Sequence, residues 1–302
     1  MLPSICAAIV TPITSSFDVD IPKLAAHAKG VLDNGCDGVV LFGTTGEAAS
    51  FGLAQRQATL NGLIKHGVPA TKIIVGTGCC SFADTALLSR HALGHGCAAV
   101  LVHPPYFFRP AEDAGVYRFF AGLADTLGEA ARDILFYHFP EMTGAPISHN
   151  VIADLFEAYP SVFAGIKDST GVIEHTLSLV QQFPTLKVYS GDDDLLWPVL
   201  TAGGHGVITA TANLTPHLLA EVKSGWHDNT QAAQDAQTVL AGLWNKTLLS
   251  YPVSEAVKEI IAHLTQDGSW RNLAPPLSRL SMKQRTQLLK DVSPYMPHLQ
   301  VL

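Results

Sequence analysis

The sequence is poor in charged residues and contains no long apolar run. Asp, Glu, Lys and Arg make up 15% of its 302 residues, against 47% hydrophobic residues. No stretch approaches the roughly 18 uninterrupted apolar residues of a membrane-spanning helix. This composition excludes intrinsic disorder and a membrane-spanning helix. It predicts extensive burial, either in a large core or between the subunits of a homo-oligomer.

Positive charge is also scarce. The 19 Lys and Arg residues are outnumbered by 26 Asp and Glu residues, which gives a formal net charge of -7 and leaves no basic cluster. A nucleic-acid partner is therefore not expected. The segment from Met1 to Phe17 lacks a basic region and a cleavage-like site, so no signal peptide is expected either.

The cysteines form neither a C-x-x-C motif nor an even disulfide framework. They lie in apolar or glycine-rich surroundings, at Cys6, Cys36, Cys79, Cys80 and Cys97. This usage is typical of a reduced, cytoplasmic protein, and we expect all five thiols to be packing groups.

Short apolar runs recur along the first two thirds of the chain, with helical periodicity between them. The runs are Ile5–Val10, Gly38–Phe42, Lys72–Gly76, Ala98–Val102, Ile134–Tyr137, Phe163–Lys167, Lys187–Ser190 and Gly206–Thr209. Continuous rather than alternating apolar residues indicate strands that are buried on both faces, as in a parallel sheet covered by helices. Eight such units predict an α/β fold, a (β/α)8 TIM barrel.

The remaining third of the chain shows helical spacing only. Apolar residues recur at helical intervals over Thr230–Ser250 and Val253–Leu264, and Ser281 can cap a last helix that continues through Leu289. We therefore predict a barrel domain over residues 1–224 and a C-terminal helical extension over residues 225–302.

Active sites of such barrels lie at the carboxyl ends of the strands. The sixth apolar run ends in Lys167, and strand alternation places Ile166 and Lys167 on opposite faces. If Ile166 packs against helices, Lys167 points into the barrel, where burial favours a free amine that can attack a carbonyl and form a Schiff base. A solvent-exposed lysine at a strand end is the alternative.

Other residues at strand ends supply the remaining groups that a Schiff-base aldolase needs. Tyr137 ends the fifth run with a hydroxyl that can move protons, although a tyrosine there can also be a core aromatic. The turn Gly43–Glu47 offers consecutive hydroxyls and amides that can hold a carboxylate. Glycines at Gly203–Gly206 let the backbone approach a small ligand. We interpret the acidic run at Gly191–Asp194 as a solvent-exposed segment.

The order of these motifs resembles the dihydrodipicolinate synthase / N-acetylneuraminate lyase family of pyruvate-dependent class I aldolases. The matching segments cover essentially the whole chain: Ala8–Pro12, Gly43–Glu47, Tyr137 with Pro140, Gly165–Asp168, Ser190–Asp193 and Gly203–Ile208. The resemblance implies that Lys167 forms a Schiff base with pyruvate, that Tyr137 relays protons, and that Thr44 assists the relay.

The same resemblance implies the rest of the site and the assembly. Thr45 and nearby amides such as that of Gly43 would bind the pyruvate carboxylate, and Tyr106 and the backbone at Val207 and Ile208 would line the pocket. No metal and no cofactor beyond the covalent lysine–substrate imine is implied. The partners would be a keto acid and an aldehyde, in a homotetramer built as a dimer of dimers, or in a homodimer.

Two departures bear on the substrate. Where the synthases carry an arginine that grips the carboxylate of aspartate semialdehyde, this chain has Met142, which cannot make such a bidentate pair. Where they carry an inter-subunit relay tyrosine, it has Phe107. Both departures favour an enzyme that cleaves or dehydrates a 2-keto-3-deoxy acid, or that joins pyruvate to an aldehyde lacking that carboxylate.

Four alternatives remain open. The first is a true 4-hydroxy-tetrahydrodipicolinate synthase, and the second is a catalytically inactive barrel that binds a keto acid. The third is a metal-dependent aldolase or hydrolase that uses His103, His138 and His205, although these histidines form no H-x-H or H-E-x-x-H pattern. The fourth, a phosphate-binding isomerase, is disfavoured because the acidic run follows the seventh strand.

Overall fold

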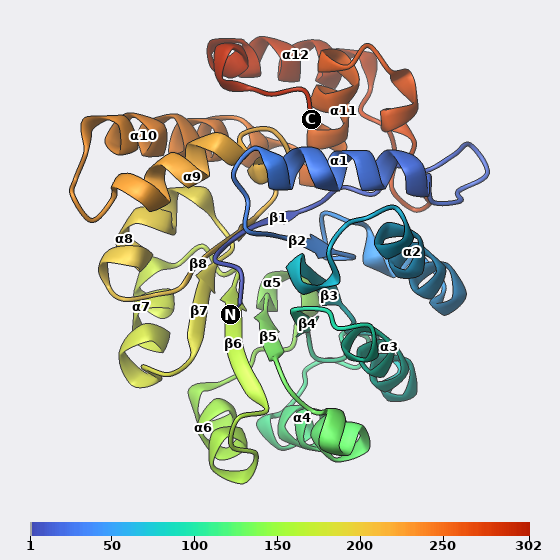
Figure 1. The fold of residues 1–302 in the computed structure, drawn as a ribbon, viewed down its shortest axis with the longest axis vertical. Helices are drawn as coiled ribbons and strands as arrows, with labels where there is room; N and C mark the ends of the chain where they lie inside the picture. Colours follow the sequence, from blue (N-terminus) through green and yellow to red (C-terminus); the bar gives the residue numbers. More distant parts are fainter. Residues whose placement is uncertain (1) are drawn as a thin grey trace. The chain divides into compact units, whose positions relative to one another are not determined.

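All eight predicted apolar runs form strands. The computed structural model describes residues 2–302, and the strand ends lie within two residues of the predicted ones. The strands are β1 (Ile5–Ala8), β2 (Gly38–Leu41), β3 (Ile73–Gly76), β4 (Ala99–Val102), β5 (Ile134–His138), β6 (Phe163–Asp168), β7 (Lys187–Ser190) and β8 (Gly206–Thr209). They close into a barrel in chain order, which confirms the predicted (β/α)8 fold (Figure 1).

Helices alternate with the strands and continue beyond the last one. They are α1 (Ile21–Asp33), α2 (Leu53–Lys65), α3 (Phe82–Gly94), α4 (Asp113–Leu127), α5 (Pro140–Thr143), α6 (His149–Ala158), α7 (Ile173–Gln182), α8 (Leu196–Thr201), α9 (Pro216–Gly225), α10 (Gln231–Lys246), α11 (Val253–Leu264) and α12 (Met282–Val292). The predicted cap at Ser281 is confirmed, because its side chain and that of Gln284 form a capping box at the start of α12.

The chain divides into two compact units. One comprises residues up to Ser4 with Ala70–Ile208, and the other comprises Ile5–Pro69 with Thr209–Leu302. The predicted boundary after residue 224 falls one residue before the end of α9, and a domain division at that place stays a prediction.

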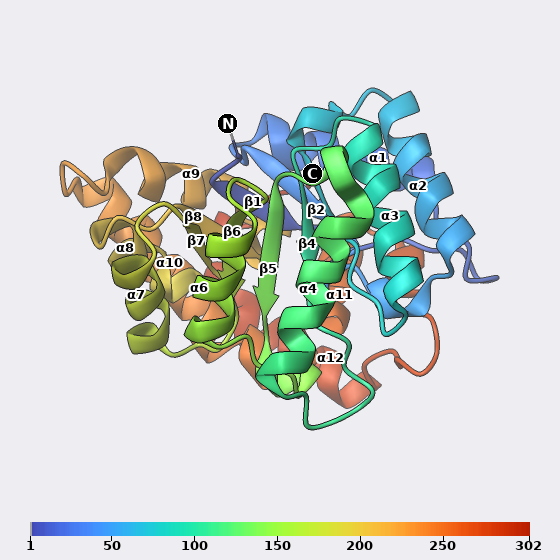
Figure 2. The same ribbon diagram turned by 90° about the horizontal axis from the view of Figure 1, so that it is seen from below.

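The unit formed by Ala70–Ile208 contains the strands from β3 onward. Strands β5, β6 and β7 pair in parallel, and the register between β5 and β6 shifts between Ile134 and Leu135. Helix α4 packs between α3 and α6 (Figure 2). The rings of Phe120, Phe136 and Phe163 pack together, with Phe136 and Phe163 stacked at 4.8 Å between centroids.

The other unit contains both the beginning and the end of the chain. Strands β1 and β2 pair in parallel, α1 packs on α2, and α9 packs on α10 (Figure 1). Its core is an apolar cluster contributed largely by α10, α11 and α12, and includes Leu243, Trp244, Val257, Ile260 and Leu288. The C-terminal helices therefore share a compact unit with the first two strands.

None of the helices within residues 2–302 combines the length and the apolar character needed to cross a bilayer. None of the five cysteines, all of which lie within the described residues, forms a disulfide, and Cys80 is the exposed one.

Candidate active site

Lys167 and Tyr137 meet inside the unit formed by Ala70–Ile208. The two residues are register partners on neighbouring strands β5 and β6, so their side chains leave the sheet on the same face. The Lys167 Nζ lies 3.5 Å from the Tyr137 hydroxyl and 4.6 Å from the centre of its ring. Lys167 is 7% exposed and Tyr137 is 4% exposed. The lysine is therefore buried beside the hydroxyl, and the solvent-exposed alternative is excluded.

Two residues after β4 extend this group of side chains. The His103 ring lies 6.4 Å from the Tyr137 ring and 5.4 Å from the Tyr106 ring. A Cβ at Gly78, which follows β3, would lie 2.8 Å from the backbone nitrogen and the ring of His103. Because Gly78 has no side chain, His103 can occupy this position beside it. Tyr106, predicted as a substrate-binding residue, thus belongs to the same aromatic chain as Tyr137.

A second pair of polar residues lies directly behind the first. His138 and Asp168 follow Tyr137 and Lys167 and are themselves register partners, so they point to the opposite face of the sheet. Asp168 Oδ2 accepts hydrogen bonds from Thr176 Oγ1 at 2.6 Å and from His175 Nδ1 at 3.0 Å. These contacts fix the end of β6 against α7.

The charges of this second pair follow from its contacts. Burial opposes ionisation of Asp168, but hydrogen bonds from His175 and Thr176 outweigh it and lower the pKa of the carboxyl. The hydrogen bond to Asp168 raises the pKa of His175. Burial lowers the pKa of His138 to about 4, so this imidazole is neutral near pH 7.

His138, Asp168 and His175 together could in principle hold a metal ion, because their ligand atoms lie within 4.8 Å of one another. However, His138 Nδ1 accepts the backbone N–H of Ile147 at 3.1 Å. The neutral ring then carries its proton on Nε2, and neither nitrogen has a lone pair to offer. The hydrogen bonding of His138 therefore does not fit a metal ligand.

The three histidines of the metal-dependent alternative do not converge. His103 contacts the aromatic chain, whereas His138 lies on the opposite face of the sheet from Tyr137. His205 precedes β8, at the amino end of that strand, where its Nε2 contacts the carbonyl of Leu2 at 3.1 Å. This separation argues against a shared metal site.

Gly206, the first residue of β8, does not serve the role predicted for the glycines of this segment. They lie at the amino end of the strand, and a Cβ at Gly206 would lie 2.0 Å from the carbonyl oxygen of Ser4. Close packing on the N-terminal segment, rather than close approach to a ligand, explains Gly206. In the strand itself Gly206 pairs with Tyr189 and Val207 with Ser190, so Ile208 shares the face of Lys167 and Val207 does not. Their predicted backbone role stays a prediction.

The acidic run after β7 is not a solvated loop, contrary to the sequence-based interpretation. Asp193 is fully buried, and Asp192 is half-buried. Burial, reinforced by Asp194, raises the pKa of Asp192 to about 6, while the positive charge of Lys167 acts in the opposite direction. Sequence reasoning missed Asp192 because its signal, three consecutive aspartates, is more common in exposed turns.

The predicted carboxylate-binding turn lies in the other unit, after β2. Thr44 is exposed, Thr45 is half-buried, and the carbonyl of Thr44 accepts the N–H of Glu47 at 2.9 Å. A Cβ at Gly46 would lie 2.9 Å from the carbonyl oxygen of Ile9, which explains that glycine. The roles expected of Gly43, Thr44 and Thr45 stay predictions.

Both departures that bear on the substrate lie at exposed positions. Met142, in the short helix α5, is 55% exposed, and its carbonyl accepts a hydrogen bond from Arg109 Nη2 at 3.1 Å. Phe107 is 75% exposed and meets Phe108 edge-to-face.

Comparison with known proteins places these observations in a family. The Dihydrodipicolinate synthetase family matches residues 1–294 of this chain. An uncharacterized DapA-like lyase of Chloroflexus aurantiacus is 36% identical over 230 residues, which cover 76% of each protein.

Solved structures show the same relationship. Dihydrodipicolinate synthase from Agrobacterium tumefaciens matches with a TM-score of 0.87 and 33% identity, covering 96% of this chain and 98% of that one. YagE of Escherichia coli, described as a putative 2-dehydro-3-deoxy-D-gluconate aldolase, is 28% identical over 290 residues, 93% of this chain and 94% of YagE. Its crystal structure in complex with pyruvate matches with a TM-score of 0.88 and 26% identity, covering 98% and 99% of the two chains.

Proposed function

Because the chain belongs to the dihydrodipicolinate synthetase family of lyases, we propose that it is a pyruvate-dependent class I aldolase whose Schiff base forms on Lys167. The observation that carries this proposal is the buried amine of Lys167 beside the hydroxyl of Tyr137. Lysine side chains are seldom buried, so a catalytic role best explains a buried lysine beside a tyrosine hydroxyl.

The chemistry begins with attack of the Lys167 amine on the C2 carbonyl of a keto acid, which gives a carbinolamine. Loss of water from the carbinolamine gives the imine. Tyr137 donates the proton that the departing hydroxyl needs. It then accepts the proton of the substrate hydroxyl when the carbon–carbon bond breaks, and it donates a proton to the aldehyde oxygen when that bond forms. The imine draws the electron pair of that bond into an enamine, so that one product leaves as an aldehyde.

The remaining predicted residues bind and orient the substrate. Thr44 assists the relay through Tyr137, while Thr45 and the amide of Gly43 hold the keto-acid carboxylate. Tyr106 and the backbone at Val207 and Ile208 line the pocket. No metal and no organic cofactor enters this mechanism, because the imine itself is the electron sink.

Met142 and Phe107 support a substrate other than aspartate semialdehyde. A methionine offers no bidentate contact to a second carboxylate, and a phenylalanine offers no hydroxyl for a relay. The similarity to YagE, which was solved with pyruvate, favours a 2-keto-3-deoxy acid as the substrate. Cleavage of this acid would release pyruvate, whereas dehydration would retain the pyruvate unit in the product. Synthase activity and an inactive keto-acid-binding barrel are the competing outcomes.

Borohydride reduction in the presence of pyruvate, followed by peptide mass analysis, tests the proposal. We expect a pyruvate-sized adduct on Lys167 in the native protein and none in the Lys167→Arg variant. Tyr137→Phe should still form the adduct but should turn over about 100- to 1,000-fold more slowly. The absence of any adduct would exclude this mechanism and would support the inactive barrel, whereas an adduct on another lysine would exclude Lys167 as the residue that forms the Schiff base.

A substrate panel separates the aldolase from the synthase. We expect pyruvate release from at least one 2-keto-3-deoxy acid and poor turnover of pyruvate with aspartate semialdehyde in a coupled assay. Efficient synthase kinetics with Met142 in place would overturn the substrate assignment but not the Schiff base.

We also propose that the enzyme is a cytoplasmic homo-oligomer, either a dimer or a dimer of dimers. The free thiols support the location. The low charge content and the exposed pair Phe107–Phe108 support the association of copies of this chain.

A further inference from the structure

A buried ion pair joins the turn after β2 to helix α11. Lys258 Nζ contacts Glu47 Oε1, and neither side chain has any exposed surface. The two residues are 211 positions apart in the sequence. Both belong to the unit formed by Ile5–Pro69 and Thr209–Leu302. The pair is therefore a direct link between the predicted carboxylate-binding turn and the C-terminal helices.

At one end of the link, Glu47 terminates the turn. Its N–H bonds the carbonyl of Thr44 at 2.9 Å, and its backbone adopts a left-handed conformation with φ of 58°. This conformation is uncommon for a residue with a side chain. Thr11 Oγ1 donates to the carbonyl of Gly46 at 2.8 Å. Holding the Glu47 side chain thus holds the turn on which Thr44 and Thr45 lie.

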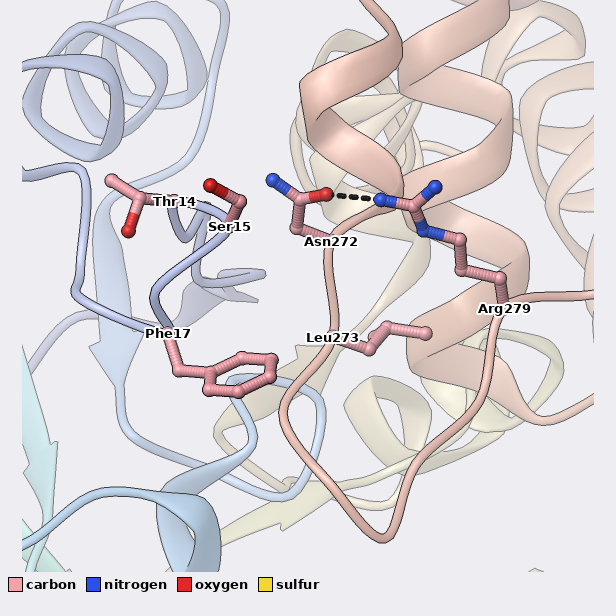
Figure 3. A pocket seen from close by; sticks show the side chains of 6 residues that line it. All are labelled: Thr14, Ser15, Phe17, Asn272, Leu273 and Arg279. Carbon is pink, nitrogen blue, oxygen red and sulfur yellow. Dashed lines mark hydrogen bonds between the residues drawn. The ribbon is translucent and has the colours of Figure 1, made fainter.

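At the other end, Lys258 also holds a loop. Its Nζ donates to the carbonyl oxygen of Asn272 at 2.9 Å. Asn272 in turn donates from Nδ2 to the carbonyl of Ile13 at 2.9 Å and accepts a hydrogen bond from Arg279. Figure 3 shows Asn272 and Arg279 joined beside Thr14, Ser15 and Phe17 around a small pocket. Lys258 therefore has two fixed anchors, the turn and this loop.

Burying such a pair is energetically unfavourable compared with apolar packing. Burial raises the pKa of Glu47 and lowers that of Lys258, and the attraction between the two charges opposes both shifts. Replacing a buried ion pair by well-packed apolar residues is often neutral or stabilising, so stability alone does not account for its presence. Its location, at the end of the turn, indicates a role in geometry.

We propose that Glu47 and Lys258 are positioning residues that fix the Thr44–Thr45 turn for binding of the pyruvate carboxylate. This inference rests on the proposed function, because it assigns the turn to that carboxylate. It makes Lys258 the residue through which helix α11 supports the substrate-binding turn, although α11 itself donates no group to the substrate.

The test compares Glu47→Gln, Lys258→Met and the double variant with the native enzyme. A misplaced turn weakens the grip on the carboxylate, so we expect KM for pyruvate, or for the pyruvate-releasing substrate, to rise by about tenfold or more. The kcat value should fall by a smaller factor than KM rises, because Lys167 and Tyr137 are untouched and only the assisting Thr44 moves with the turn. The pyruvate concentration for half-maximal borohydride adduct formation should rise in parallel.

Glu259→Gln is the matched control. Glu259 is the next residue along α11 and is 3% exposed, and its cationic partners are Arg271 and Arg285. This variant also disturbs the ion pairs of a buried carboxylate on the same helix, although the two arginines are partly exposed. It should lower the melting temperature but leave KM for pyruvate within about twofold of the native value.

The double variant separates positioning from stability. It carries no unpaired buried charge, so it should melt closer to the native protein than Lys258→Met does. Its KM should nevertheless remain raised. A native-like KM in the folded double variant would overturn the proposal, whether or not Lys258→Met folds. A native enzyme that forms no adduct at Lys167 would instead overturn the proposed function.

Discussion

At the scale of single residues, consecutive residues at the ends of β5 and β6 have different roles. Tyr137 and His138 are consecutive, as are Lys167 and Asp168, and each pair sends one side chain to either face of the sheet. The first residue of each pair forms the candidate site. The second is buried behind it, where Asp168 binds His175 and Thr176.

The Asp168–His175 pair gives stability a defined pH window. The raised pKa of His175 means that its contribution is complete below about 6.5 and is lost as the pH rises through the folded value. The lowered pKa of Asp168 means that its contribution is complete above about 3.8 and is lost as the pH falls through its folded value. The pair therefore stabilises the fold most in weakly acidic solution.

We expect His175→Gln to destabilise the protein by about 1.5 kcal/mol in weakly acidic solution and by less above neutral pH. Urea unfolding at several pH values measures this difference. Thr176→Val removes another donor to Asp168 and serves as the control, since its effect should not decrease between those two conditions. A His175→Gln penalty that is the same at both would show that His175 acts as a neutral hydrogen-bond donor.

The effect of ionisation on stability should have the opposite sign for Asp192 to the one it has for Asp168. Burial, helped by Asp194, raises its pKa from 3.8 to about 6. A folded value above the unfolded one favours the folded state at low pH, and this advantage is lost as the pH rises through about 6. Ionised Asp192 therefore destabilises the fold near neutral pH.

Asp192→Asn should accordingly raise the free energy of unfolding at about pH 8, by on the order of 2 kcal/mol, and should have little effect below about pH 4. Thermal unfolding of both proteins across this range provides the measurement. A variant that is less stable than the native protein at high pH would show that the carboxylate has a favourable partner there.

At the scale of elements, the apolar runs located every strand, because strands buried on both faces need continuous apolar residues. The cap at Ser281 could also be predicted from the local sequence, because Gln284 follows Ser281 at the spacing of a capping box. The role of Gly206 could not be predicted from the sequence. Glycine signals close approach, but the sequence does not say whether the approaching group is a ligand or, as here, the chain around Ser4.

Gly206→Ala tests that correction. Its Cβ would lie 2.0 Å from the Ser4 carbonyl oxygen, which is backbone and cannot rotate away. We expect a loss of about 1 to 3 kcal/mol in the free energy of unfolding, as for an overpacked core. The same substitution at Gly96, where nothing lies within 4 Å but φ is 76°, controls for backbone conformation. Equal losses at both positions would refute close packing as the reason for Gly206.

At the scale of the whole molecule, the sequence predicted a barrel followed by an appended set of helices. The structure has both, and its C-terminal helices also form one compact unit with β1 and β2. Local patterns could not reveal this grouping, because it depends on contacts between distant residues such as Glu47 and Lys258. The candidate pair Lys167–Tyr137 was predictable because both residues end strands that are neighbours in a barrel of sequential strand order.

The assembly of the molecule can be tested through its exposed aromatic pair. Phe107 and Phe108 are 75% and 83% exposed, and we expect them to be covered by a second copy of the chain. Substituting both by serine should shift the protein to a smaller species in sedimentation velocity, while Met282→Ser, at another exposed apolar residue, should not. An unchanged sedimentation coefficient for the double variant would place the interface elsewhere.

The register shift between β5 and β6 has a consequence for strand phase. Ile134 pairs with Phe163 and Leu135 pairs with Gly165, so Ala164 is an extra residue in β6. In a regular strand, Phe163 and Lys167 would share a face, because four positions separate them. The added residue changes the phase, which lets Phe163 stack on Phe136 among the helices while Lys167 faces Tyr137. If β6 kept Ala164 but paired regularly, without this bulge, it would lose either the contact of Phe163 with Phe136 or that of Lys167 with Tyr137.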